Sequence, residues 1–556
     1  MSLTAIATAH ALLLLRNWLW QRTKLPPGPS GLPIVGNLLQ LGPRPHESLA
    51  ALANAYGPLL SLKLGSITTI VASSPKIAKE ILQKNDHAFA GRGIPDSATA
   101  EPNYELSVAW LPPGPLWRTL RKILNTQIMT TQMLDALQGL RNEKMVEMVR
   151  HLGEVAAQGK EVNIGWLAFA TTFNLLSTAV FSTNLFDLGP EDGSQDFKDA
   201  TARIMELAGR PNLSDYFPVL RPFDLQRLRR SIKVHYDRLH VLINKMIDQR
   251  LRSREIGMPK KNDFLEVLLD YSQEHGPEFD RRQVNSLVAV RAVASALQTR
   301  TMRLCREFVF FEMMQVGSPR LSFLSADDAS GFPPKSNSIH AVLDPIIILG
   351  SDDQRDLFVA GSDTTSTTIE WVMAELLRNP EAMAKAKQEL ADAMGTSAGQ
   401  PIQESDIPHL RYLQAVVKEA MRLHPTVPLL LPHKTIADVE LCGFTIPQNT
   451  QVLINAWALA RDSSVWEDPT SFKPERFLTS EVDFRDGNFS FIPFGAGRRI
   501  CPGMPLAVRM VSLMVATLVH SFEWKLPNGM LAHEMDMGDR FGVTLQKADP
   551  LLAIPF

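Results

Sequence analysis

The sequence predicts a mainly α-helical protein with small β-sheets. Long stretches place apolar residues three and four positions apart, as amphipathic helices do, whereas β-forming residues occur only in short runs. No repeat of fixed period is present. The composition, with 45% hydrophobic and 21% charged residues, is that of a chain that folds around a large core.

Length, charge and cysteine content narrow the class further. The 556 residues suit one large domain or two medium ones. A net charge of −2 without a long run of like charge argues against a surface that binds nucleic acid. Cys305, Cys442 and Cys501 are too few for a disulfide framework in so long a chain, which indicates a reducing compartment.

The amino terminus has the features of an uncleaved membrane anchor. Leu3 to Leu15 form a mostly apolar stretch, which Trp18, Trp20 and several basic residues follow. We expect residues 1–24 to be the anchor, with a helix lying on the membrane surface as the alternative. The basic flank keeps the rest of the chain on the cytosolic side. Residues 25–33, rich in proline and glycine, form a stiff hinge.

The secondary structure predicted after the hinge begins with a hairpin. Leu59–Leu64 and Ile67–Ala72 are its strands, and Gly65 lies at its turn. Apolar spacing then predicts helices at Met133–Val155, Leu225–Leu251, Asp356–Leu377, Ala382–Met394 and Leu413–Leu423. Short strands are predicted at Val439–Ile446, Gln451–Asn455 and Gly542–Leu545.

The segment from Phe494 to Gly503 carries the strongest chemical signal. Cys501 lies in a glycine-rich turn, where a thiolate suits the ligation of a haem iron. Gly495, Gly497 and Gly503 permit positive φ and close approach of the backbone to a flat cofactor, and Arg499 suits one of its carboxylates. The alternative is a buried cysteine without chemistry, which does not account for how the whole segment fits together.

The pattern F-x-x-G-x-R-x-C-x-G resembles the haem-binding loop of the cytochrome P450 family. The resemblance implies the cytochrome P450 fold for residues 34–556, haem b (iron protoporphyrin IX) as cofactor and Cys501 as the iron ligand. An E-x-x-R motif and a P-E-R-F motif also resemble the family's. They imply that Glu419, Arg422 and Arg476 form a buried structural network behind the haem.

The segment A-G-S-D-T-T resembles the family's oxygen-activation motif and lies in the helix predicted at Asp356–Leu377. The resemblance implies that Asp363 and Thr364 deliver protons during oxygen activation, a general-acid role. A glycine in mid-helix beside hydroxyl residues weakens the local backbone hydrogen bonds and opens room for dioxygen and water. Ala360 and Gly361 are expected to line the substrate pocket.

Further residues are expected around the cofactor and the substrate. W-x-x-x-R resembles a family motif in which Trp117 and Arg121 hold a haem propionate. His433 occupies the position where many relatives place an arginine for the other propionate. A surface imidazole is the alternative for His433. The apolar run containing Leu429 and Leu430 is expected to line the substrate pocket.

Over longer segments the chain resembles plant microsomal members of the family, of the geraniol 8-hydroxylase and terpenoid-hydroxylase group. This implies a monooxygenase that uses O2 on a small apolar substrate, with electrons from NADPH through NADPH–cytochrome P450 reductase. It also implies the endoplasmic reticulum membrane, with the catalytic domain on the cytosolic face. Arg118, Lys122 and Arg498 are candidate contacts for the reductase.

One segment departs from the family pattern. Residues 288–355 lack clear periodicity and interrupt what relatives carry as one long helix. Val288 to Gln354 is compatible with an unspliced in-frame intron, and a genuine surface insertion is the alternative. A non-catalytic or misfolded product of the insertion is therefore an alternative function. A related isomerase or dehydratase, which keeps haem but does not activate oxygen, is a second alternative, and the intact Asp363–Thr364 pair argues against it.

Overall fold

The computed structural model describes most of the chain outside a few segments. The described residues are 25–100, 107–125, 129–182, 212–260, 356–394, 401–484 and 487–556, with isolated positions between 184 and 269. The predicted anchor at 1–24 and the atypical segment at 288–355 both lie outside them.

A bundle of helices forms the larger part of the molecule, with α15 (Asp356–Arg378) at its centre. Helix α15 packs against α7 (Ile164–Phe181), α16 (Pro380–Met394), α17 (Arg411–Leu423) and α19 (Met504–Ser521). Its apolar residues Ile369, Trp371 and Val372 are no more than 1% exposed. The carboxyl-terminal half of α15 is mainly apolar and belongs to the core, whereas its middle carries a run of mostly buried polar residues, Ser362 to Thr368.

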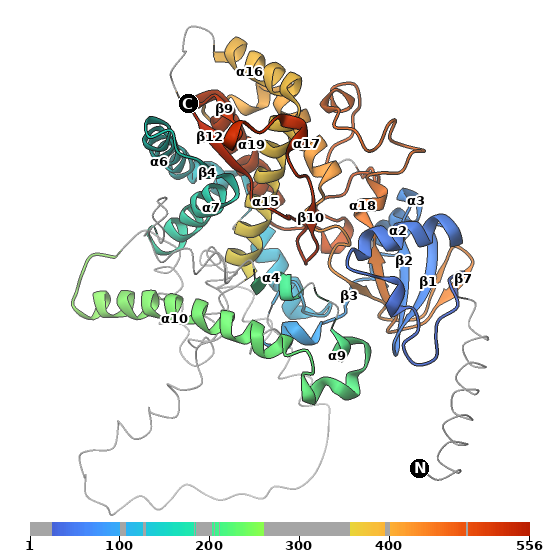
Figure 1. Cartoon of the computed structure of the whole chain (residues 1–556). Helices are drawn as coiled ribbons and strands as arrows, with labels where there is room; N and C mark the ends of the chain where they lie inside the picture. Colours follow the sequence, from blue (N-terminus) through green and yellow to red (C-terminus); the bar gives the residue numbers. More distant parts are fainter. Residues whose placement is uncertain are drawn as a thin grey trace, which may run out of the picture.

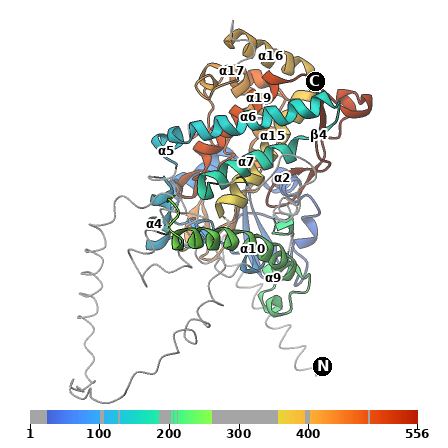
Figure 2. The ribbon, with the colours of Figure 1, turned by 90° about the vertical axis from the view of Figure 1, so that its left-hand side faces the viewer.

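The predicted helices are present, with shifted ends. The helix predicted at Met133–Val155 is two helices, α5 (Thr131–Ala136) and α6 (Gln138–Ala157), because the backbone leaves the helical conformation at Leu137. The helix predicted at Leu225–Leu251 is α10 (Leu228–Glu255). Figure 2 shows α10 lying across the lower end of the bundle, below α7. Other helices are α2 (Pro45–Tyr56), α3 (Pro75–Lys79), α4 (Pro115–Ile123), α9 (Leu213–Tyr216) and α18 (Ala456–Leu459).

A five-stranded sheet, in the order β1-β2-β8-β5-β3, lies beside the bundle. The predicted hairpin forms β1 (Leu59–Leu64) and β2 (Ile67–Ala72), paired antiparallel. Strand β2 pairs in parallel with β8 (Gln451–Ile454), and β8 pairs with β5 (His433–Lys434). Strand β5 pairs in turn with β3 (Gly91–Arg92), so the sheet sets Arg92 opposite His433.

The short strands near the carboxyl end differ from the prediction. Gly542–Leu545 is not a strand but the turn between β10 (Asp539–Arg540) and β11 (Gln546–Lys547). Tertiary contacts hold this turn, because the Leu545 N–H donates to Thr426 O and Thr544 bonds to α15. The remaining strands are β4 (Val162–Asn163), β6 (Val439–Leu441), β7 (Phe444–Ile446), β9 (Trp524–Lys525) and β12 (Leu552–Pro555).

Within the described part of the chain, one helix is long and apolar enough to cross a membrane, namely α19. Its position explains that composition, since 61% of the helix is buried inside the protein. It packs against α15, α16, α17 and α6. Helix α19 is therefore a core helix, and its first residue directly follows the cysteine turn.

Candidate active site

The cysteine turn is shaped by glycines in left-handed conformations. Gly495 and Gly497 have φ values of 69° and 66°. A Cβ atom on Gly497 would lie 1.9 Å from the Leu82 carbonyl oxygen, so no larger residue fits without movement of the backbone. The Cys501 N–H donates to Phe494 O over 2.9 Å, which closes the turn. The first glycine of the predicted haem-binding motif, Gly497, is therefore required by the shape of the turn. The second, Gly503, has a φ of −79° and does not use the left-handed region.

Cys501 is a free cysteine beside the amino terminus of α19. Part of its surface is open to solvent, while protein surrounds the sulfur on its other sides. The N–H groups of Gly503 and Met504 donate to its sulfur, and together with the Arg121 charge they favour the thiolate. Burial by the surrounding protein opposes them and is the larger effect, so the pKa of Cys501 is raised. A positive metal ion bound to the sulfur would reverse this balance.

A cluster of cationic side chains lies near Cys501. The Arg499 guanidinium stacks 4.4 Å over the Trp117 ring, and Arg121 lies 6.0 Å from the same ring. Arg499 donates to the backbone oxygens of Ala90 and Leu111 rather than to an acid. Burial, and then repulsion from Arg121, lowers the pKa of Arg499 to about 10. The indole N–H of Trp117 is buried, and no hydrogen-bond partner for it exists in the described part of the protein.

Arg92, which no sequence motif marked, belongs to the same cluster. It donates to Leu431 O over 2.7 Å, while its buried Nε has no partner among the described residues. Burial, followed by repulsion from Arg499 and Arg121, lowers the pKa of Arg92 to about 9. Only the pairing of β3 with β5 brings Arg92 here, and that pairing joins residues far apart in the chain.

His433 is buried beside Arg92, and it is not a surface imidazole. Its Nδ1 lies 2.8 Å from Phe89 O; because a carbonyl oxygen only accepts, Nδ1 must carry the hydrogen. Burial, with repulsion from Arg92, lowers the pKa of His433 to about 3. A carboxylate brought next to His433 would raise this pKa.

These residues fit haem. Arg92, Arg121 and Arg499 repel one another in the protein interior, which is costly unless negative charge joins them. The unpaired Trp117 N–H and Arg92 Nε are donors that two carboxylates would satisfy. Cys501 offers the soft anionic ligand that haem iron accepts.

On α15, Asp363 and Thr364 have different partners. The Asp363 carboxylate is 4% exposed and accepts hydrogen bonds from Thr544 Oγ1 and Gln546 Nε2, at 2.8 and 2.9 Å. The Thr364 hydroxyl donates back to Ala360 O over 2.6 Å. Such a bond loosens the helix locally. Thr544 and Gln546 belong to the β10–β11 hairpin and were not found from sequence.

Glu419, Arg422 and Arg476 meet in one buried network. Arg422 donates two hydrogen bonds to the Glu419 carboxylate, at 2.7 and 2.8 Å, and neither residue is exposed. Arg476 Nε donates to the same carboxylate over 2.9 Å. The remaining donors of Arg422 are taken by the backbone oxygens of Ala460, Pro469 and Ser471. The network is complete in itself, unlike the cluster around Arg92.

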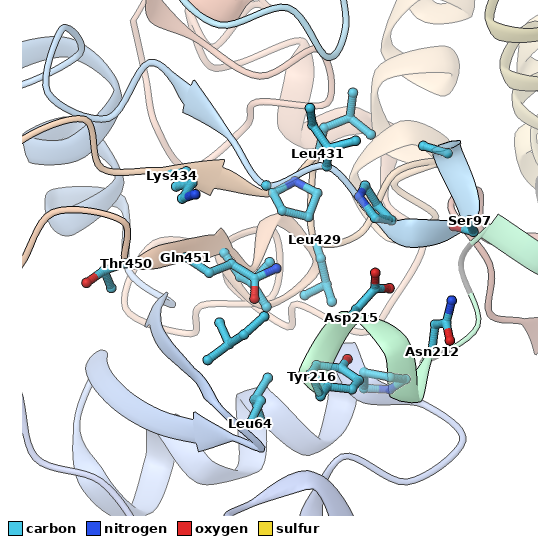
Figure 3. Close-up of a pocket in the computed structure, with 18 of the residues that line it drawn as sticks. Leu64, Ser97, Asn212, Asp215, Tyr216, Leu429, Leu431, Lys434, Thr450 and Gln451 are labelled. Atoms are coloured by element: carbon cyan, nitrogen blue, oxygen red, sulfur yellow. The ribbon is translucent and has the colours of Figure 1, made fainter. Parts of the chain in front are cut away.

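A cavity of about 660 Å3 lies between the five-stranded sheet and α9 (Figure 3). Leu429 and Leu430 line it, whereas Ala360 and Gly361 are not part of its wall. A Cβ atom on Gly361 would meet Leu176 of α7 at 3.3 Å, so this glycine allows close helix packing. Leu430 reaches toward the cysteine turn, with its Cδ1 3.8 Å from where a Cβ of Gly495 would lie.

Comparison with known proteins agrees with this geometry. The family model described as cytochrome P450 matches residues 26–315 and 354–552. A geraniol 8-hydroxylase of Catharanthus roseus is 43% identical over 540 residues, covering 97% of this chain and 95% of that protein. A geraniol 8-hydroxylase of Swertia mussotii is 42% identical, covering 95% and 93%. A drimenol monooxygenase of Persicaria hydropiper is 41% identical, covering 98% and 94%.

The chain therefore belongs to the cytochrome P450 family, and its relatives include terpenoid hydroxylases. Membership confirms the predicted fold class and identifies the protein as a monooxygenase, an oxidoreductase. It also implies haem iron as the cofactor.

Replacing Gly497 by alanine should disrupt the cysteine turn. The added Cβ would clash with the Leu82 backbone and strain the φ of 66°, costing more than about 3 kcal/mol of unfolding free energy. Gly529→Ala is the matched control, because Gly529 has a φ of 70° with nothing within 4 Å. It should cost about 1–2 kcal/mol. Equal losses in denaturant unfolding would contradict the steric role of Gly497.

Replacing Glu419 by glutamine should destabilise the protein strongly. The guanidiniums of Arg422 and Arg476 would lose their shared countercharge inside the protein, at a cost of about 3–5 kcal/mol. Thermal unfolding and the haem content per chain would measure the effect. As a control, Glu475→Gln breaks the exposed pair with Lys385 and should change neither quantity appreciably.

Proposed function

We propose that this protein hydroxylates a small apolar terpenoid on haem held by Cys501. The observation that carries the proposal is the group of unneutralised arginines beside a free cysteine thiol, which matches the carboxylates and iron of one cofactor. The cavity approaches the cysteine turn through Leu430, and its apolar residues there, Leu429 to Leu431, suit an apolar molecule. The substrate class comes from relatives named for geraniol and drimenol.

In this proposal haem, when bound, supplies the iron chemistry that activates O2. Trp117, Arg121, Arg499 and His433 hold its carboxylates, and Arg92 joins them. Phe494, Gly495 and Gly503 shape the turn that presents Cys501.

Asp363 and Thr364 move protons in the proposed reaction. Thr544 and Gln546 keep the Asp363 carboxylate in one orientation, because each of its oxygens accepts a bond from one of them. The Thr364 hydroxyl can exchange its bond to Ala360 O for one to a reacting group, since it sits where the helix is loosened.

Electrons are proposed to come from NADPH through NADPH–cytochrome P450 reductase. Arg118 and Lys122 on α4 and Arg498 in the cysteine turn are exposed, and they would meet an acidic partner. Arg498 already forms an ion pair with Asp86, with Nε and Oδ1 3.0 Å apart. A reductase that docks there would replace the Asp86 carboxylate by one of its own.

The proposed location is the endoplasmic reticulum membrane, with the catalytic domain on its cytosolic face. Ile34 and Leu39, just after the hinge, are 62% and 76% exposed. Val219 and Phe223, just after α9, are 80% and 65% exposed. The β1–β2 turn links the two apolar groups, because Gly65 N–H donates to Val35 O and Ser66 N–H to Tyr216 O. Ile34 and Leu39 come soon after the predicted anchor in the chain. The two apolar groups would therefore rest on the membrane that holds the anchor.

The segment at 288–355 is proposed to be foreign to the working enzyme. The family model leaves residues 316–353 unmatched, within this segment. The segment ends where α15 begins, and α15 is the centre of the helical core. An insertion there would separate α15 from the chain that relatives join to it.

The proposed activity is tested with membranes that contain this protein and the reductase. With NADPH and O2, geraniol should yield a product one oxygen atom heavier, as measured by mass spectrometry. Cys501→Ser should abolish both the product and the red-shifted carbon monoxide band of the reduced enzyme, because the thiolate ligand is lost. Cys442→Ser, at a distant hairpin turn, should leave both intact. Rearranged products without added oxygen would favour an isomerase or dehydratase instead.

Deleting Val288 to Gln354 should raise the yield of folded, haem-loaded protein severalfold, because it restores one continuous chain into α15. Haem content and the carbon monoxide difference spectrum measure this. Equal haem incorporation and turnover by both chains would show that the segment is a tolerated surface insertion.

A further inference from the structure

Around α9 the cavity is lined by polar as well as apolar residues, and two of the polar ones lie on α9 and at its N-cap. Asp215 and Asn212 both line the cavity. In Figure 3 the Asp215 side chain extends from α9 toward the space beside Leu429, with Asn212 next to it. Neither residue takes part in the site that we describe for haem.

Asn212 has a donor without a partner. Its Oδ1 caps α9 by accepting from the Ser214 N–H over 3.0 Å. Its Nδ2 is buried and has no hydrogen-bond partner among the described residues, and Asn212 is only 2% exposed. A buried amide donor without a partner costs free energy unless a ligand satisfies it.

Asp215 supplies an acceptor on the same side of the cavity. One carboxylate oxygen accepts from the Asp96 N–H, which fixes the side chain on the cavity wall. Burial is the main cause that raises the pKa of Asp215 to about 6, and the Asp96 charge adds to it while Arg221 opposes it. The group is therefore an ionised acceptor at about pH 8.

We propose that Asp215 and Asn212 form a subsite for a hydroxyl group, so that the enzyme selects apolar substrates that carry an alcohol. This rests on the proposed function and specifies its substrate. An alcohol donates to the carboxylate and accepts from the amide, so it satisfies both groups.

Charged head groups suit this subsite less well. An ammonium group would pair with Asp215 but would face Arg221, which also lines the cavity. A carboxylate would pair with Arg221 but would be repelled by Asp215 and by buried Asp96. A neutral alcohol meets neither repulsion. Its apolar chain can then extend along Leu429 and Leu430, toward the cysteine turn.

The test compares the binding of geraniol with that of geranial, the matching aldehyde, which accepts hydrogen bonds but does not donate. Dissociation constants are measured by isothermal titration calorimetry on the haem-loaded enzyme at about pH 8, where Asp215 is ionised. The enzyme should bind geraniol on the order of tenfold more tightly than geranial, the worth of one hydrogen bond to a charged group.

Two variants change one group each while keeping its structural contact. Asp215→Asn keeps an oxygen for the Asp96 N–H but replaces the acceptor in the cavity by a donor, so geranial should bind at least as tightly as geraniol. Asn212→Asp keeps the oxygen that caps α9 but removes the amide donor, so both ligands should bind more weakly. Thr68→Val, where β2 lines the cavity, is the control and should leave the geraniol-to-geranial ratio unchanged.

The outcomes separate the subsite from the proposed function. If the enzyme oxidises geraniol but Asp215→Asn keeps the ratio of the unmodified enzyme, the subsite is wrong and terpenoid hydroxylation stands. If neither ligand binds the unmodified, haem-loaded enzyme, both proposals fail.

Discussion

The carboxylate of Glu419 is the constraint on which the haem-binding side of the molecule depends. It binds the guanidiniums of Arg422 and Arg476, and it also accepts from the Lys473 N–H. These bonds tie α17 to the irregular segment that leads toward the cysteine turn. Because the charges are buried, each partner needs the others, so the segment is held in one position.

The arginines around Arg92, unlike Arg422 and Arg476, have no carboxylate countercharge in the part of the chain that the structure describes. Arg92, Arg121 and Arg499 are held by backbone oxygens and an aromatic ring, without a carboxylate among their described contacts. Their depressed pKa values show that the protein interior holds positive charge that it does not itself neutralise. One buried network thus stabilises the fold, and the other is prepared for an anionic cofactor.

The division between family chemistry and substrate choice follows the architecture. Asp363 and Thr364 lie on α15, and Cys501 lies just before the start of α19. These two helices pack against each other in the core. The cavity wall that carries Asp215 belongs to α9, a short helix at the edge. Substitutions at such an edge alter recognition without disturbing the core, which is how one fold serves relatives with different substrates.

The sequence alone determined the features that depend on neighbouring residues. The cysteine turn, the helix of α15 and the β1–β2 hairpin were all predictable, because glycine positions and apolar spacing act locally. Tertiary structure decided the rest. Arg92 meets His433 only through sheet pairing across the chain, and Asp363 meets Gln546 only through a hairpin that the sequence suggested was a strand. Such contacts arise from packing between distant segments, where no local pattern of residues exists to predict them.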